Sequence, residues 1–220
     1  MDKGYAIYPG VIEPEECEVV KLSISASRTH PARAGTRHLM SNAAVSAMAR
    51  DPRLKLIAAE FVGSAPVPFS ATLFEKTGQA NWLIAWHQDT ALPIANAFEA
   101  EGWGPWSKKS GVCFAHAPAW ALLRVIALRL HLDDSGADNG PLRVIPWSHG
   151  EGVLRDPEVL ARAAAVQPVD CLVNRGGVIA MRPLLIHASS KSIRDLPRRV
   201  LHILYADCIE LAPGVELAVA

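Results

Sequence analysis

Residues 86–89 read Trp86-His87-Gln88-Asp89 and end a short apolar segment that begins at Trp82. If residues 81–89 form a β-strand, His87 and Asp89 leave the same face, because alternate side chains of a strand point to the same side. His187 ends a second apolar run, residues 181–186, on a strand that can fold over the first. Two imidazoles and one carboxylate can hold Fe(II) and leave coordination positions open. The sequence therefore predicts that His87, Asp89 and His187 are the metal ligands and catalytic residues of an iron oxygenase.

Composition limits the other classes of function. The chain has 220 residues, half of them apolar, which is enough for one sizeable core. Lys and Arg balance Asp and Glu, 22 against 22, so there is no basic surplus to bind nucleic acid. The first residues lack the pattern of a secretory signal, and charged residues or prolines interrupt every apolar stretch before it reaches membrane-spanning length. Four scattered cysteines without CxxC spacing favour reduced thiols. We expect a cytoplasmic protein that binds neither nucleic acid nor membrane; the sequence leaves its oligomeric state open.

Periodicity divides the chain into a helical start and a β-rich remainder. Residues 10–63 carry helical spacing, with Pro14 and the acidic residues after it at the start of a helix, and Ser41-Asn42 as a cap. Short β-type runs begin after Pro66, and one Ala-rich helix is expected over residues 157–166. This order predicts one domain, mainly β with flanking helices, as a β-sandwich or jelly roll over about residues 66–208 with the N-terminal helices packed outside it. The β-type runs are 67–74, 82–87, 122–132, 142–145, 169–173, 178–181 and 200–205.

Residues 90–120 stand apart, because they carry aromatic residues and prolines and follow Asp89 directly. A loop of this length in a compact domain is usually a lid, a binding loop or disordered, and the aromatic residues argue against disorder. We expect a lid loop over the metal. Trp103 and Trp106 are equally compatible with packing inside this lid and with contact to the substrate.

Three motifs in one order carry a family resemblance. The first is His87-Gln88-Asp89. The second is residues 139–149, Asn139-Gly140-Pro141-Leu142-Arg143-Val144-Ile145-Pro146-Trp147-Ser148-His149. The third is His187-Ala188-Ser189, followed by Pro197-Arg198-Arg199. Over about residues 66–208 the chain resembles the phytanoyl-CoA dioxygenase family. The resemblance implies a double-stranded β-helix of the cupin type that uses Fe(II), O2 and 2-oxoglutarate, releases succinate and CO2, and hydroxylates a small-molecule substrate.

The resemblance also assigns roles to residues. His87, Asp89 and His187 match the iron ligands of the family. Arg198 matches the arginine that pairs with the distal carboxylate of 2-oxoglutarate, and Ser189 matches a hydroxyl that supports it; a guanidinium fork suits this task because it binds a carboxylate in bidentate fashion. The chain has Trp147 and Ala188 where the family often has glycine, and neither residue is a ligand. Related halogenases lack the carboxylate, so Asp89 favours hydroxylation or a related oxidation.

Other polar residues are less decided by the sequence. Arg129 and His131 alternate with leucines and share one strand face. If that face lines the interior, Arg129 can bind 2-oxoglutarate or substrate; exposure to solvent is the alternative. Ser70, Thr72 and Lys76 present the same choice. His30, His38 and His202 have no spacing that favours a ligand, so we expect structural roles for them.

Two alternatives to hydroxylation remain at this stage. The same metal site can catalyse desaturation, epoxidation or rearrangement, and the sequence does not separate these outcomes. A non-catalytic β-helix that binds a ligand without metal is the other alternative, which the intact set of His87, Asp89, His187 and Arg198 disfavours. The sequence does not identify the substrate.

Overall fold

Two antiparallel sheets form the body of the protein. The computed structural model describes residues 3–27, 35–77, 81–193 and 196–220, so His30 lies outside the described residues. The larger sheet has five strands. Their order is β1 (Tyr5–Tyr8), β10 (Val178–Met181), β7 (Val125–His131), β12 (Arg198–Ala206) and β2 (Val67–Lys76). The sheet therefore also recruits β1, a strand that precedes the helical start.

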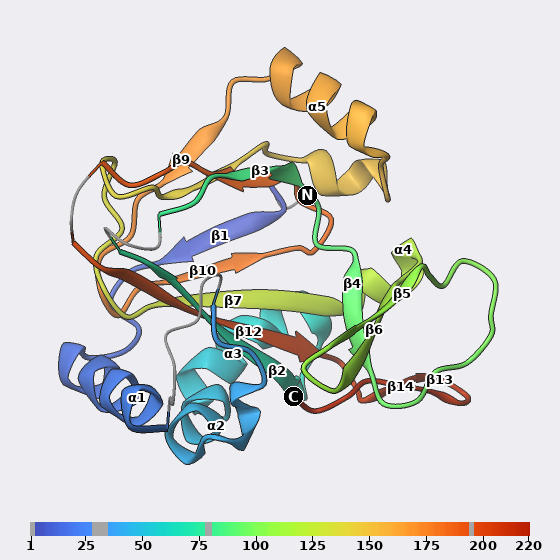
Figure 1. Ribbon diagram of the computed structural model, residues 1–220, viewed down its shortest axis with the longest axis horizontal. Coiled ribbons are helices and arrows are strands. Elements are labelled where there is room, and N and C mark those ends of the chain that lie inside the picture. The colour runs from blue at the N-terminus through green and yellow to red at the C-terminus, as the bar shows by residue number, and fades with distance from the viewer. Residues whose placement is uncertain (1–2, 28–34, 78–80, 194–195) are drawn as a thin grey trace.

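The smaller sheet lies across the core from the larger one (Figure 1). It is ordered β3 (Ile84–His87), β11 (His187–Ser189), β8 (Leu142–Val144) and β9 (Val169–Cys171). Apolar residues from both sheets meet in one buried cluster, which includes Ile179 and Met181 of the larger sheet and Val144 of the smaller. The predicted fold class, mainly β with flanking helices, is confirmed.

Alternation along the strands assigns the two faces of the larger sheet. In β7, Leu128 and Leu130 belong to the cluster that contains the helices, whereas Ala127 belongs to the cluster between the sheets. Arg129 and His131 share the face of Ala127 because they alternate with the leucines, and both are buried. The polar face of β7 is thus the inner one.

The N-terminal helices cover the outer face of this sheet (Figure 1). Pro52 occupies the first turn of α3, and the Asp51 carboxylate caps it by accepting a hydrogen bond of 2.8 Å from the Arg53 amide. Asn42 caps α2 in the same way through the Val45 amide, at 3.1 Å. The helices are α1 (Pro14–Ser27), η1 (Leu39–Ser41), α2 (Ala43–Ala49) and α3 (Pro52–Val62). None of the helices in the described part of the chain is long and apolar enough to cross a membrane.

The segment expected to be a lid loop differs from the prediction. Residues 90–120 contain β4 (Ala91–Ile94), β5 (Trp106–Lys109) and β6 (Val112–His116), which form a three-stranded sheet in the order β4-β6-β5, and the short helix α4 (Ala119–Leu122). The strands are short and interrupted by Gly and Pro, so the periodicity does not stand out. Trp103 packs edge-on against Phe98 at 5.1 Å and against Trp120 at 6.1 Å, which favours a packing role. The remaining elements are η2 (Ser148–Glu151), α5 (Asp156–Ala165), β13 (Glu210–Ala212) and β14 (Val215–Glu216).

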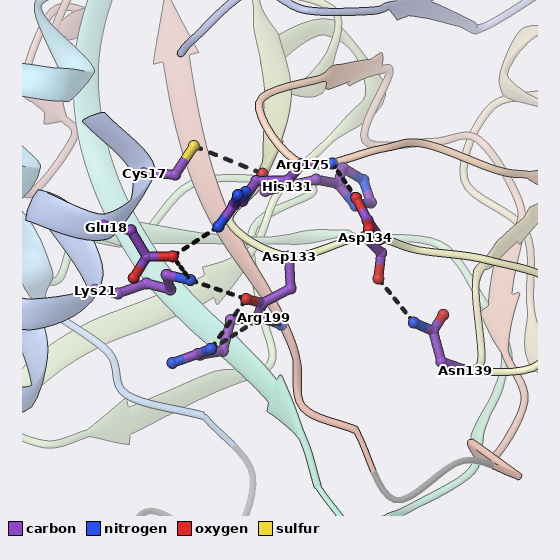
Figure 2. Close-up of polar contacts among 9 residues, drawn as sticks. All are labelled: Cys17, Glu18, Lys21, His131, Asp133, Asp134, Asn139, Arg175 and Arg199. Atoms are coloured by element: carbon purple, nitrogen blue, oxygen red, sulfur yellow. Dashed lines mark hydrogen bonds and ion pairs between the residues drawn. The ribbon is translucent and has the colours of Figure 1, made fainter. Parts of the chain in front are cut away.

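An ion-pair network joins α1 to the ends of β7 and β12 (Figure 2). The Asp133 carboxylate accepts hydrogen bonds from Lys21 at 3.0 Å and from Arg199 at 2.6 and 2.9 Å. Burial acts to raise the pKa of Asp133, but the hydrogen bonds and charges of Arg199 and Lys21 outweigh it and lower the pKa. Arg199 therefore faces away from the interior and has a structural partner.

We predict that Asp133→Ala destabilises the fold, because it leaves Arg199 without its partner and the nearly buried Lys21 with Glu18 alone. Removing one member of a buried pair costs about 3 kcal/mol or more, and urea unfolding measures it. Glu151→Ala is the matched control, since Glu151 pairs with Arg162 at the surface and such pairs contribute little. Equal losses in the two variants would show that the network does not hold α1.

Candidate metal centre

Strand pairing brings the two histidines together. His87 is the last residue of β3, His187 is the first of β11, and the two are register partners. Their ring centroids lie 4.2 Å apart. Asp89 follows two residues after His87, and its carboxylate oxygens lie 3.6 Å from Nε2 of each imidazole. One ligand atom from each residue falls within 4.8 Å of the other two, which fits three ligands of one ion.

Backbone contacts fix the orientation of both imidazoles. Nδ1 of His87 lies 2.8 Å from the Ala85 carbonyl, and Nδ1 of His187 lies 2.9 Å from the Leu185 carbonyl. A carbonyl only accepts, so Nδ1 carries the proton in each ring and Nε2 keeps its lone pair. Both Nε2 atoms face Asp89. Hydrogen bonds of this kind, made by the ring nitrogen that does not bind the ion, hold histidine ligands of metals in place.

The electrostatics also suit a cation. Burial lowers the pKa of His187 to about 4, so this ring is neutral near neutral pH. Burial acts to raise the pKa of Asp89, but the interactions with His187 and His87 outweigh it and lower the pKa, so the carboxyl is ionised. Neutral imidazole and carboxylate are the forms that bind a metal ion. With three protein ligands, an octahedral ion keeps positions free for small molecules, as in non-haem iron oxygenases.

Gln88, between the two ligands, holds the strand end in place. Its amide nitrogen donates to the carbonyls of Gly152 and Leu184, each at 2.8 Å. Its amide oxygen accepts from the Leu154 amide at 2.8 Å. The side chain points away from the ligands, as alternation requires, and ties the Asp89 segment to two other parts of the chain.

A second polar group lies buried between the sheets. Arg198 begins β12 and pairs across the strands with Lys76 of β2. Both are almost fully buried, at 2% and 1% exposure. The Lys76 ammonium donates to Ser189 Oγ at 2.7 Å and to the Ser190 carbonyl, and Ser189 Oγ donates to the Gly140 carbonyl at 2.8 Å. The second and third motifs thus meet at one place.

Gly140 explains the glycine of the second motif. Its φ is +70°, a conformation that side chains rarely adopt. A Cβ atom there would collide with the Ser190 carbonyl and would lie 3.0 Å from the Lys76 ammonium nitrogen. The glycine lets the chain approach the buried lysine closely.

The buried cations have hydrogen-bond donors without a partner among the described residues. Several buried nitrogen atoms lack a hydrogen-bond partner among the described residues: Nε and Nη1 of Arg198, Nε of Arg129 and both ring nitrogens of His131. Burial lowers the pKa of Arg198 to about 9, with a contribution from Arg129, and burial with repulsion by both arginines lowers the pKa of Lys76 to about 7. Unpaired buried donors are costly. An anion bound among them would remove that cost, and a dicarboxylate fits this requirement.

Arg129 and His202 form a further buried pair next to Asp89. Nη1 of Arg129 donates to Nδ1 of His202 at 3.2 Å, and the guanidinium lies 5.6 Å from the centre of the Phe74 ring. Burial, with help from Arg129, lowers the pKa of His202 to about 3, so the ring is neutral. Arg129 is therefore interior rather than exposed, which decides between the two alternatives left by the sequence.

Several residues around the centre were interpreted as structural or left undecided by the sequence analysis. His202, interpreted as structural, lines a cavity that also includes Asp89 and His38. Its position four residues after Arg198 on one strand places it on the same face, a signal that was present in the sequence. Lys76, which the sequence left undecided between the interior and solvent, lies two residues beyond Phe74 on the inner face and is almost fully buried. Ser70 and Thr72 line the same cavity.

Comparison with known proteins identifies the family. The sequence model of the phytanoyl-CoA dioxygenase (PhyH) family matches residues 1–200 of this chain. The chain belongs to the phytanoyl-CoA dioxygenase family. It is a non-haem iron, 2-oxoglutarate-dependent dioxygenase. None of the curated proteins compared with the chain is a match.

Solved structures of low sequence identity share the fold. AviO1 from Streptomyces viridochromogenes Tue57 is 22% identical, with a TM-score of 0.68 over 99% of this chain and 93% of that chain. EctD from S. alaskensis, solved with 2-oxoglutarate and 5-hydroxyectoine, is 19% identical, with a TM-score of 0.70 over 93% and 72%. The epimerase SnoN, solved with Fe3+, α-ketoglutarate and nogalamycin RO, is 17% identical, with a TM-score of 0.69 over 94% and 80%. The double-stranded β-helix fold is thus common to all of them.

We predict that His87→Ala and Asp89→Ala each abolish tight binding of Fe(II), because two ligands hold an open-sided ion poorly. Metal content after dialysis and calorimetric titration with Fe(II) under anaerobic conditions measure the loss, and circular dichroism reports whether the fold survives. Asp170→Ala removes an exposed carboxylate of the same sheet and should bind metal normally. Full metal occupancy in the Asp89 variant would rule out this set of ligands.

Proposed function

We propose that the protein hydroxylates a small organic substrate at an Fe(II) ion held by His87, Asp89 and His187. The observation that carries this proposal is that those three side chains lie near buried cations whose donors have no partner among the described residues. Bound Fe(II), 2-oxoglutarate and O2 supply the oxidising chemistry, in which succinate and CO2 leave and one oxygen atom enters a substrate C–H bond. The protein orients the reactants, excludes water from the site and provides the charged groups that bind them.

We assign the distal carboxylate of 2-oxoglutarate to Arg198, Lys76 and Ser189. Nε and Nη1 of Arg198 are buried and have no hydrogen-bond partner among the described residues. A guanidinium can bind a carboxylate with two parallel hydrogen bonds. Lys76 adds a second positive charge, and Ser189 fixes the ammonium by accepting from it. An anion in this place would also restore the pKa values of both cations toward normal, since it would offset the effect of burial.

Arg129 has a different place in the proposal. It is the register partner of His202, which lies four residues after Arg198 on β12. Its Nε has no partner among the described residues. We assign this group to the co-substrate as a second contact that orients it. His202 stays neutral and holds the guanidinium from behind.

The intact carboxylate ligand argues against halogenation, because Asp89 occupies the position that related halogenases leave open. Desaturation, epoxidation and rearrangement use the same centre, and SnoN, which shares the fold, is described as an epimerase.

All four cysteines are free thiols, which fits the reducing cytoplasm that we propose as the location.

Formation of succinate tests the proposal. The protein with Fe(II), 2-oxoglutarate and O2 should form succinate slowly without a substrate and faster when a metabolite mixture contains one. The product, identified by mass spectrometry, should be heavier than its substrate by one oxygen atom. Product formation without succinate, or with zinc in place of iron, would contradict the assignment to this class.

We predict that Arg198→Ala raises the concentration of 2-oxoglutarate required by a factor of about 100 or more, since leaving a buried charge unpaired costs about 3–5 kcal/mol. Binding of Fe(II) should be almost unchanged. Arg199→Ala is the matched control on the next position of the strand, because Arg199 pairs with Asp133 instead. It should lower stability and leave the 2-oxoglutarate requirement unaltered; similar requirements in the two variants would show that Arg198 is not the anchor.

A further inference from the structure

A cavity next to Asp89 is lined by both the inner face of the larger sheet and the β4-β6-β5 sheet. Its volume is about 270 Å³. This is slightly below the lower end of the range for drug-sized ligands, so it suits a small metabolite. Ser70, Thr72 and His202 line it from the larger sheet, and Phe114 and Lys109 line it from the smaller three-stranded sheet.

The charges of this cavity are unbalanced. Among the described residues that line it, Arg37 and Lys109 are the permanent cations, and Asp89, a metal ligand, is the carboxylate. Neither Arg37 nor Lys109 forms an ion pair within the described part of the chain. The Lys109 ammonium instead lies over the Phe114 ring, 4.7 Å from its centre. Once Asp89 binds a metal ion, the positive charges of Arg37 and Lys109 therefore have no carboxylate counterpart among the described residues that line the cavity. His202 is neutral and adds no charge.

Backbone contacts hold the two cations near each other. Thr36 exchanges two hydrogen bonds with Leu73 of β2, at 2.9 and 2.8 Å, which anchors the residue before Arg37. Nε2 of His38, the residue after it, lies 3.0 Å from the Lys109 carbonyl and donates to it, because a carbonyl only accepts. The two elements that carry the cations are thus tied to each other directly. Burial and the charge of Arg37 both lower the pKa of Lys109, which agrees with two like charges held close.

Two like charges that line one cavity on segments tied together, without a counter-ion, favour binding of an anion, because the bound anion removes their repulsion. We propose that the primary substrate carries an anionic group, a carboxylate or a phosphate, which binds between Arg37 and Lys109 at the cavity rim. Thr72 and His202 can hydrogen-bond a polar group of its body, and Phe114 and Leu204 can pack on its apolar part. This inference rests on the proposed function, which makes the cavity the substrate side of the metal centre.

Calorimetric titration with matched ligands tests this inference. The probes are carboxylic acids of six to ten carbon atoms (about the size that this cavity can hold), their primary amides, and phosphate monoesters of the corresponding alcohols. The anaerobic protein is first saturated with Fe(II) and 2-oxoglutarate, so that the probes cannot occupy the co-substrate site. We expect the acids or the phosphates to bind at least about tenfold tighter than the amides, the effect of charge-assisted hydrogen bonds. The stronger of the two anion series identifies the group.

Variants attribute the preference to the two cations. Arg37→Gln/Lys109→Gln should bind acids and amides equally, whereas Lys109→Arg keeps the charge and should keep the preference. Lys108→Gln is the matched control, because Lys108 is the adjacent, exposed residue of the same strand and its side chain leaves the other face. Equal binding of acids and amides by the unaltered protein would overturn the inference, and so would an undiminished preference in the double variant with an unchanged unfolding midpoint.

Failure of this inference can be told from failure of the proposed function. Succinate formation by the unaltered protein without added probe reports on the oxygenase alone. If succinate forms and no anion is preferred, the substrate class is wrong and the function stands. If succinate does not form, the function itself is wrong.

Discussion

The antiparallel register between β3 and β11 places His187 directly opposite His87, and the rest of the site depends on this pairing. A slip of one residue would turn every side chain of β11 to the other face. His187 would then leave the metal, and Ser189, two residues further, would leave Lys76 at the same time. One register therefore positions both the two histidines of the metal centre and Ser189, which we propose supports the co-substrate. The hydrogen bonds of Gln88 and the close approach at Gly140 fix the segments on either side of it.

The buried polar groups between the two sheets lower the stability of the fold and can bind a ligand. Arg129, Arg198 and Lys76 are buried with donors or charges that the described residues do not match. Such groups destabilise a fold on their own. The outer face of the same sheet offsets this, because it packs leucine, isoleucine and alanine side chains against the N-terminal helices. A ligand that binds the native state and not the unfolded chain would add stability that rises with the logarithm of its concentration. The co-substrate is thus expected to stabilise the protein as well as to react.

The sequence predicted the inner features better than the outer ones. Motif spacing identified His87, Asp89 and His187, because ligand chemistry permits few residue types and strand alternation fixes i and i+2. The fold class followed from the change of periodicity near Pro66. The β4-β6-β5 sheet was missed because its strands are four or five residues long and carry Pro93 and lysines in place of an alternating apolar pattern. Arg37 and Lys109 could not be predicted as neighbours, since 71 residues separate His38 from the carbonyl that ties them together. Contacts of this range depend on tertiary packing, which local patterns do not encode.

The most direct test of the account is an anaerobic titration of the protein with Fe(II) and 2-oxoglutarate, followed by visible absorption. A keto acid that chelates Fe(II) gives rise to a charge-transfer band in the visible range. The account predicts that the band requires both components, saturates at one iron and one 2-oxoglutarate per chain, and is lost when His187 is replaced by alanine. Binding of 2-oxoglutarate without such a band, or a band that persists in the His187→Ala variant, would contradict the metal centre described for this protein.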